Sequence, residues 1–306
     1  MRIGSRAQSG TKFQNFKSAP LKERLKFMAR AVLLSALFAT GAAAEIDDLR
    51  KGCAAGSEMD CKKLSRVINE LQRNCDADGE ENALDCANLG YAYDSNRSFR
   101  QAARYYDRAC KLGEQKGCVY LGLLYNDGQG VAQDRKRANE LFSDACKKNS
   151  SEGCASLAYN YKKGLGVYPD VKKAIELLSK ACKMGQVEAC HNLGLSYALS
   201  DGVKKDVDRA RTFFTRACEQ GHVDSCVNLG VTYFKGDGGQ KDHALAAKYF
   251  SEACEKSDEP LACSNLAYQY EKGWGVAKDK KRARKLYEKA CKLGRFDACE
   301  HLETMR

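Results

Sequence analysis

Residues 182–226 read CKMGQVEACHNLGLSYALSDGVKKDVDRARTFFTRACEQGHVDSC and carry the pattern on which the fold prediction rests. The segment begins and ends with a pair of cysteines, and the same pair recurs along the chain. The first cysteines of these pairs stand at 110, 146, 182, 218 and 254, at steps of 36, and then at 291. A period of about 20–50 residues is the sequence signature of a solenoid, in which each unit packs on its neighbours.

The residues before each first cysteine have the spacing of a helix. Alanine stands eight before the cysteine, and aromatic or leucine residues stand five and four before it, as in Ala210, Phe213 and Phe214 before Cys218. This spacing places the apolar residues on one helix face. An aspartate twelve before the cysteine, such as Asp206, is placed to cap the helix start. A glycine three after it, such as Gly221, or Asn149 in one repeat, is placed to end the helix.

Another helix is predicted to begin just before the partner cysteine, which is the second cysteine of each pair. Leucine follows that cysteine at three residues, glycine or alanine at four and tyrosine at seven, as in Leu193, Gly194 and Tyr197. A small residue inside a helix costs up to about 1 kcal/mol in propensity. Its recurrence therefore indicates that a neighbouring helix passes too close for a side chain. The Gly-x-Gly-Val segments between the helices predict left-handed turns, not phosphate loops, because no strand precedes them.

These motifs resemble the Sel1-like repeat, a relative of the tetratricopeptide repeat, and the Cys-x7-Cys in each unit resembles the Helicobacter cysteine-rich protein family. The resemblance covers about residues 53–306 and implies an all-α solenoid of helix-turn-helix repeats. We expect four segments: a cleaved leader at 1–44, atypical N-terminal capping helices at 45–85, six repeat units at 86–298 and a partial C-terminal capping helix at 299–306.

The N-terminus predicts a secretory signal peptide. An apolar stretch, Ala31 to Ala44, follows a basic region and ends in three alanines, and it is too short to span a bilayer comfortably. Met28 would be a more ordinary start than Met1. A mitochondrial presequence and a retained membrane anchor are the alternatives. Residues 1–44 hold eight Lys/Arg and one acid, so the remaining 43 Lys/Arg and 39 Asp/Glu leave a net charge of +4, which does not favour nucleic acid as a partner.

The sixteen cysteines form eight local pairs, which after a signal peptide predicts disulfides formed in an oxidising compartment. The predicted bridges are Cys53 with Cys61, Cys75 with Cys86, Cys110 with Cys118, Cys146 with Cys154, Cys182 with Cys190, Cys218 with Cys226, Cys254 with Cys263 and Cys291 with Cys299. One cysteine ends a helix and the other begins the next, so their Cα atoms are expected about 5–6 Å apart. Metal binding is the rival, but the chain has no Cys-x-x-Cys and four scattered histidines, so we expect neither a metal nor a cofactor.

The candidate ligand-binding residues stand two and five residues after the partner cysteine. In tetratricopeptide arrays, which the repeat resembles, this face is concave and binds peptides. The candidates are Asn88, Tyr91, Tyr120, Tyr159, Asn192, Asn228, Asn265 and Tyr268. Alternatively, the asparagines bond to neighbouring helices and the tyrosines fill gaps between units.

Three functions remain open. The first is an exported, monomeric scaffold that binds a protein, a peptide or a peptidoglycan-like ligand along its concave face, in the periplasm or outside the cell. The second, implied by the cysteine-rich family, is β-lactam binding or hydrolysis. After Ala44, however, the sequence has no Ser-x-x-Lys, Ser-Asp-Asn or Lys-Thr-Gly and no cluster of zinc ligands, so its catalytic residues would be unknown. The third is a mitochondrial intermembrane-space assembly factor.

Overall fold

The computed structural model describes residues 41–77, 79, 82–237 and 239–305. Within these ranges the chain forms fifteen α-helices and no strand, which confirms the predicted all-α solenoid. The helices are α2 Gly41–Ala54, α3 Glu58–Asp76, α4 Ala83–Ser95, α5 Phe99–Lys111, α6 Gln115–Asp127, α7 Arg135–Lys147, α8 Ser151–Lys163, α9 Val171–Lys183, α10 Val187–Leu199, α11 Val207–Glu219, α12 Val223–Lys235, α13 His243–Ser257, α14 Pro260–Lys272, α15 Lys280–Lys292 and α16 Phe296–Thr304.

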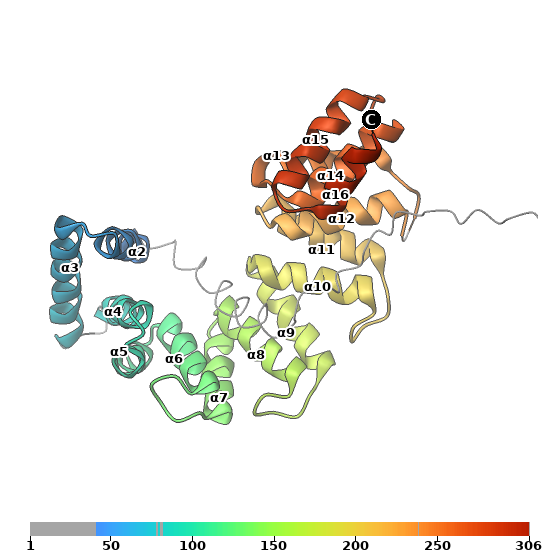
Figure 1. The fold of residues 1–306 in the computed structure, drawn as a ribbon. Helices are drawn as coiled ribbons and strands as arrows, with labels where there is room; N and C mark the ends of the chain where they lie inside the picture. The colour runs from blue at the N-terminus through green and yellow to red at the C-terminus, as the bar shows by residue number, and fades with distance from the viewer. Residues whose placement is uncertain (1–40, 78, 80–81, 238, 306) are drawn as a thin grey trace, which may run out of the picture.

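Each repeat unit is a pair of antiparallel helices. We call α4, α6, α8, α10, α12 and α14 the first helices of their units, and α5, α7, α9, α11, α13 and α15 the second helices. The helices follow a curved path, with α4 and α6 on the inner side of the curve and α5 and α7 on its outer side (Figure 1). In these units the first helices lie along the concave side of the array.

Aspartate caps begin five of the second helices, as the sequence predicts. The side chain of each accepts a hydrogen bond from the backbone N–H three residues later, for example Asp206 from Arg209 at 2.9 Å. The same contact is made by Asp134, Asp170, Asp242 and Asp279. The backbone N–H of Asp206 also donates to the carbonyl of Tyr197, at 3.0 Å, so one residue fixes both the turn and the helix start.

The recurrent glycine of the first helices lies against a ring of the second helix in the same unit. A Cβ atom added at Gly194 would stand 2.5 Å from Cδ1 of Phe214, and Gly90, Gly122 and Gly230 meet aromatic rings in the same way. The prediction of a close helix approach is therefore confirmed. The tyrosine three residues further on stacks on the same second helix, with Tyr197 and Phe213 ring centroids 5.7 Å apart.

The Gly-x-Gly-Val loops pack against the preceding unit. Both glycines adopt positive φ, for example 68° at Gly164 and 69° at Gly166, as the sequence predicts. A Cβ atom at Gly166 would stand 2.6 Å from the backbone carbonyl carbon of Arg135, at the start of α7 in the preceding unit. Glycine is needed here for its backbone conformation and also for the room it leaves.

All eight predicted disulfides are formed, and no described cysteine is free. The bridges join Cys53 to Cys61, Cys75 to Cys86, Cys110 to Cys118, Cys146 to Cys154, Cys182 to Cys190, Cys218 to Cys226, Cys254 to Cys263 and Cys291 to Cys299. The prediction is therefore confirmed for the pairing of every cysteine in the chain.

The geometry of the bridges differs from the prediction in one respect. The Cα atoms of the bridged cysteines lie 4.5 to 4.9 Å apart, closer than the 5–6 Å expected from the sequence. The shorter distance follows from the tight turn, because each bridge joins the end of one helix to the start of the next. From α4 onward, the bridges link the second helix of one unit to the first helix of the following unit.

A basic side chain two residues before several of these cysteines ties neighbouring second helices together. Lys180 donates from Nζ to the carbonyl of Cys146 at 2.7 Å, Arg216 donates to the carbonyl of Lys183 at 3.3 Å, and Lys289 donates to the carbonyl of Cys254 at 2.8 Å. Each cation thus binds at the C-terminal end of a helix in the preceding unit, where unpaired carbonyls and the helix dipole favour positive charge.

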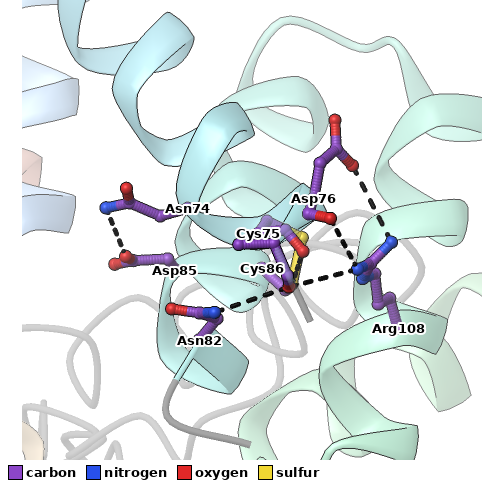
Figure 2. Close-up of a disulfide and its surroundings, with 8 residues drawn as sticks. Asn74, Cys75, Asp76, Asn82, Asp85, Cys86 and Arg108 are labelled. Atoms are coloured by element: carbon purple, nitrogen blue, oxygen red, sulfur yellow. Dashed lines mark hydrogen bonds and ion pairs between the residues drawn. A yellow bond between two sulfur atoms is a disulfide. The ribbon is translucent and has the colours of Figure 1, made fainter. Parts of the chain in front are cut away.

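The first repeat unit is joined to α3 by the same kind of contact. Arg108 of α5 donates from Nη2 to the carbonyls of Asp76 and Ala77, at 3.2 and 3.4 Å, and pairs with the Asp76 carboxylate (Figure 2). The Cys75–Cys86 bridge and an Asn74–Asp85 hydrogen bond lie beside it. The second capping helix therefore occupies the position that a second helix has elsewhere in the array.

The two ends of the array differ from the repeats between them. Helix α2 includes residues 41–44 of the predicted leader, and Ala43 and Ile46 are buried in the core. Residues 1–40, with the rest of the predicted signal peptide, lie outside the described residues. The C-terminal α16 forms the first helix of an incomplete unit. No helix in the described ranges combines the length and the apolar character needed to cross a membrane.

Candidate functional site: the inner face and a buried histidine cluster

The inner face is the side of the first helices that points away from the second helices. Numbered from the partner cysteine, the core-facing positions are 0, +3, +4 and +7, which hold the cysteine, leucine, glycine and tyrosine. At 100° per residue, positions −2, +2, +5 and +9 lie on the opposite side. In α10 these positions hold Glu188, Asn192, Leu195 and Leu199, each of them half-buried or exposed.

The structure does not present the eight predicted site residues as one exposed row. Asn192 is exposed, whereas Tyr159, Asn228 and Tyr268 are half-buried. The remaining four are buried: Asn88 at 2%, Tyr91 at 5%, Asn265 at 7% and Tyr120 at 8% exposure. Four residues in the middle and C-terminal units therefore keep the surface position that ligand binding requires.

The two buried tyrosines of the set hold neighbouring helices together. Tyr91 donates from its hydroxyl to Oδ2 of Asp47 in α2 at 2.6 Å, and burial together with this bond raises its pKa well above the usual value. The ring of Tyr120 stacks on Tyr106 of the preceding unit, with centroids 5.1 Å apart. These two tyrosines follow the structural alternative, in which the side chains fill gaps between units.

An apolar row that the sequence analysis did not identify runs along the inner face. Its members share position +5 and are half-buried: Leu123, Tyr159, Leu195, Val231 and Tyr268. Counting every position from the partner cysteine, rather than following the tyrosines alone, would have found it. The same position of the first helix carries an apolar residue in five successive units, from α6 to α14.

Charged side chains of opposite sign flank parts of the apolar row from the third unit onward, with Leu199 at position +9 of the fourth unit and Leu261 at position −2 of the sixth. Position −2 holds Glu152, Glu188 and Asp224, which are half-buried, and position +9 holds Lys163, Lys235 and Lys272, which are exposed. The two positions are eleven residues apart, or about 16 Å along a helix. One edge of the inner face is therefore acidic and the other basic.

An aromatic group lies at the C-terminal end of this surface. The ring of Trp274 is 40% exposed, stands 5.4 Å from Tyr268 in an edge arrangement and stacks on His243 at 5.3 Å. Phe234 lies 5.8 Å from the same indole. The rings pack against one another, which fixes the loop of the last complete unit on the unit before it.

Two histidines that the sequence analysis treated as scattered lie together. The rings of His191 in α10 and His222, the residue before α12, stack with centroids 4.3 Å apart. Nδ1 of His191 lies 2.8 Å from Oγ of Ser225, and Nδ1 of His222 lies 3.1 Å from the same oxygen. Nε2 of His222 lies 2.9 Å from Oε2 of Glu188. We call Glu188, His191, His222 and Ser225 the histidine cluster.

The histidine cluster breaks the repeat. Position +1 holds a buried valine in two other units, Val119 and Val227, where this unit has His191. Position −1 holds glycine or alanine, such as Gly153 and Ala189, where the next unit has Ser225. These two substitutions were not predicted, because the repeat pattern is defined by residues that recur and not by those that replace them.

Burial and charge shift the pKa values of the cluster in opposite directions. Burial, together with the neighbouring His222, lowers the pKa of His191 to about 4. Burial also disfavours the charged form of His222, but the hydrogen bond and charge of Glu188 outweigh it and raise the pKa of His222. Burial acts to raise the pKa of Glu188, but the hydrogen bond and charge of His222 outweigh it, so the pKa of Glu188 is lowered.

The order Ser225, His222, Glu188 resembles the connections of a catalytic serine, base and acid. Two features separate it from such a site. Ser225 is fully buried, at 0% exposure, so no substrate carbonyl reaches its Oγ. Nδ1 of His222 also accepts the backbone N–H of Ser225 at 3.2 Å, which is the contact of a helix cap. The arrangement is a buried network between two units.

One group of potential metal ligands occurs among the described residues, at Cys218, Cys226 and Glu252. Both sulfurs belong to one disulfide. Metal-binding cysteines act as thiolates, so this group fits a metal ion poorly.

Comparisons with known proteins agree with the repeat architecture. A curated relative, the β-lactamase HcpA of Helicobacter pylori, is 39% identical over 59 residues, which cover 19% of this chain and 24% of HcpA. The chain thus matches about a quarter of that relative's length. A crystal structure of c5321, a protective antigen of uropathogenic Escherichia coli with an SLR fold, has 28% identity and a TM-score of 0.69, and the match covers 77% of this chain and 50% of that one.

A second crystal structure, of a Sel1 repeat protein from Oxalobacter formigenes, has 26% identity and a TM-score of 0.60, and covers 71% of this chain and 86% of that one. The Sel1 repeat family model matches six segments of this chain, at residues 83–114, 115–150, 151–186, 187–222, 223–258 and 260–294. The chain therefore belongs to the Sel1 repeat family.

Proposed function

We propose that this protein is an exported, disulfide-linked scaffold that binds an extended peptide segment of a partner protein along its inner face. The observation that carries the proposal is the apolar row, which passes through five units between an acidic and a basic edge. Repeat arrays of this kind offer long concave surfaces for binding. A monomer bound to a protein, a peptide or a peptidoglycan-like fragment is the arrangement we expect.

The spacing of the row fits an extended chain. Neighbouring packed helices lie about 8–10 Å apart, and an extended peptide advances about 3.3 Å per residue. About three peptide residues therefore span one repeat unit, so every third side chain meets the next apolar residue of the row. Asn192 and Asn228 stand beside the row, where their amide groups offer both donors and acceptors to a peptide backbone.

The two charged edges would orient the bound segment. Basic side chains of a ligand would lie toward Glu152 and Asp224, and acidic ones toward Lys163 and Lys235. Charges at the rim of an interface influence specificity and association rate more than affinity. We therefore assign affinity to the apolar row and the amides, and specificity to the edges.

Export is supported by the predicted leader and by the eight disulfides. Disulfides persist in extracellular and periplasmic compartments and are rare in the cytosol. Measuring the N-terminus and the location of the protein expressed from its own gene tests this part of the proposal. Cytosolic protein with reduced cysteines would contradict it.

The binding proposal can be tested with a displayed library of random peptides selected on the oxidised protein. Enriched peptides should lose affinity by at least about tenfold, or 1.4 kcal/mol, for the double variant that combines Asn192→Ala with Asn228→Ala. Thr212→Ala, on the exposed outer surface of α11, is the matched control and should bind as the wild type does. Peptides that bind the double variant and the wild type equally would place the site elsewhere.

β-Lactam binding or hydrolysis is the alternative that similarity to HcpA suggests. Incubation with a chromogenic cephalosporin and a labelled penicillin separates the two functions, with dithiothreitol-reduced protein as the control. Saturable turnover or covalent label that disappears on reduction would favour an enzyme. A mitochondrial assembly role, the third possibility, would require import of the chain by mitochondria.

A further inference from the structure

The histidine cluster lies where the buried core of the array is divided. One large cluster of buried apolar residues extends from Ala43 to Leu193 and Ala217, and a second extends from Cys218 to Ala298. Between them lies a small group formed by Ala210, Phe214 and Leu229. At this joint the polar network lies beside the small apolar group, on which Leu195 and Tyr197 of α10 also pack.

The network has one hydroxyl for two imidazole nitrogens. Nδ1 of His191 and Nδ1 of His222 both lie within hydrogen-bond distance of Oγ of Ser225, at 2.8 and 3.1 Å. A serine hydroxyl can donate one hydrogen bond and accept others. It therefore satisfies both rings when one Nδ1 carries a proton and the other does not.

A first proton can be accommodated. His222 holds it, because its Nε2 contacts Glu188 and the carboxylate balances the charge. Nδ1 of His222 then donates to Ser225 Oγ, and the serine hydroxyl donates to the unprotonated Nδ1 of His191. The rings stay stacked, although His222 no longer accepts the backbone N–H of Ser225.

A second proton cannot be accommodated in the same geometry. With both imidazoles charged, both Nδ1 atoms donate to Ser225 and the serine hydrogen has no acceptor between the rings. Two positive rings then stack at a centroid distance of 4.3 Å in a largely buried site. Like charges at this distance repel strongly where water is scarce.

The surroundings offset this repulsion in part. Glu188 from α10 and Asp224 from α12 are the charged groups that act on the pair, and both favour protonation. The remaining close neighbour, from α11, is the uncharged ring of Phe214, whose centroid is 5.8 Å from that of His191. Consistent with this balance, the pKa of His191 is lowered to about 4 despite the nearby carboxylate.

The disulfides decide which contacts can open. The Cys182–Cys190 bridge joins α9 to α10, and the Cys218–Cys226 bridge joins α11 to α12. None of the eight bridges joins α10 to α12. Repulsion within the histidine cluster would therefore separate these two first helices while each remains attached to the second helix before it.

We propose that the histidine cluster is an acid-sensitive hinge, which opens between α10 and α12 when both imidazoles are protonated and changes the curvature of the array there. The inner face crosses this joint between Leu195 and Val231, so opening alters the spacing of the apolar row. The hinge goes beyond the proposed binding function and stands whether or not a peptide binds.

The experiment is hydrogen–deuterium exchange on the oxidised protein from pH 7 to pH 4, corrected for the intrinsic exchange rate, together with small-angle X-ray scattering. Opening that takes up one proton becomes about tenfold more favourable for each pH unit below the pKa of the exposed imidazole. We expect protection in 187–199 and 223–235 to fall with this slope below about pH 6, and the radius of gyration to rise. Residues 115–127 should keep their protection.

The variant His191→Val, which copies Val119 and Val227 at the same position, should remove both the slope and the change in radius. His301→Gln is the matched control, because His301 pairs with Glu271 in the last unit and should leave the response unchanged. If His191→Val does not form its eight bridges, Ser225→Ala replaces it and should move the opening to higher pH, because the link between the rings is lost.

An identical pH profile in wild type and His191→Val would overturn the hinge. Loss of protection in all units together would do the same, since it would mean that acid unfolds the whole array. Both outcomes are independent of peptide selection, so failure of the hinge is distinguishable from failure of the binding proposal.

Discussion

Two buried polar networks lie between repeat units, and they differ in one chemical respect. Between the second and third units, Nδ2 of Asn160 donates to Oδ1 of Asn126 at 3.1 Å and to Oδ1 of Asn139 at 2.8 Å, while Asn139 donates to the carbonyl of Leu165. Between the fourth and fifth units, the histidine cluster takes this role. Amides do not titrate and imidazoles do, so the first joint is insensitive to pH and the second is not.

The comparison shows how a repeat array can vary its joints without changing its fold. Asn160 is 1% exposed and Ser225 is 0% exposed, so the central residue of each network is shielded from water. A sealed polar network that is fully hydrogen-bonded is compatible with a packed core, and one that loses a partner is costly. The amide joint keeps its partners under all conditions, whereas the histidine joint loses one when it takes up a second proton.

The acid response of global stability should be the strongest contrast between the joints. His191 is neutral in the folded chain above its pKa of about 4 but charges near 6.5 when unfolded, so the unfolded chain binds more protons between these values. The stabilisation is present above about pH 6.5 and is lost as the pH falls toward 4, by up to about 3 kcal/mol. In denaturant titrations the wild type should lose this stability relative to His191→Val between pH 7 and pH 4, and a difference in unfolding free energy that stays constant over this range would contradict the shift.

The amide joint should respond to mutation and not to pH. Asn160→Ala leaves the Oδ1 atoms of Asn126 and Asn139 without their donor, which should cost about 2 kcal/mol of unfolding free energy. The loss should be equal at pH 7 and pH 4.5 in denaturant titrations. Ser156→Ala, on the partly exposed side of the same helix, is the control and should change stability little. A loss confined to one pH would remove the contrast between the joints.

A smaller loss of stability is expected from overpacking the fourth unit, which holds His191. Gly194→Ala would place a Cβ atom 2.5 Å from the Phe214 ring, which also packs on His191. We expect a loss of about 1.5 kcal/mol, within the range for overpacked cores. Thermal melting at pH 7 measures it. The third unit already has Ala158 at this position and Leu178 in place of the ring, so Ala158→Gly should cost only about 0.5–1 kcal/mol.

The weakest response is expected at the basic contacts between second helices. Lys180→Met and Arg216→Met each remove a hydrogen bond to a helix C-terminus. Lys180 lies in the third unit, which holds Asn160, and Arg216 lies in the fourth unit, which holds His191. Each should cost about 1 kcal/mol in denaturant titrations and less at high salt. Arg216→Met combined with His191→Val should give additive losses. A combined loss well above the sum would mean that the outer contacts also control the hinge.

Much of the fold follows from the repeat. Asp206, Gly221 and the cysteine pairs identify helix starts, helix ends and bridges because caps, left-handed residues and disulfides are local and depend on short spacings. The glycine that accommodates Phe214 is also predictable, because it recurs. The site is less predictable. Asn88 and Asn192 occupy the same repeat position, yet the first is buried beneath the capping helices and the second is exposed.

The solenoid, its period and its eight bridges are encoded locally, because each depends on residues within one repeat length, and they could be predicted from the amino-acid order. The contacts across units could not. Glu188 and His191 lie 34 residues from His222 and Ser225, respectively. They meet because the starts of α10 and α12, one repeat unit apart, lie close together in the folded array. The spacing between successive first helices is set by packing throughout the unit and not by a local sequence pattern.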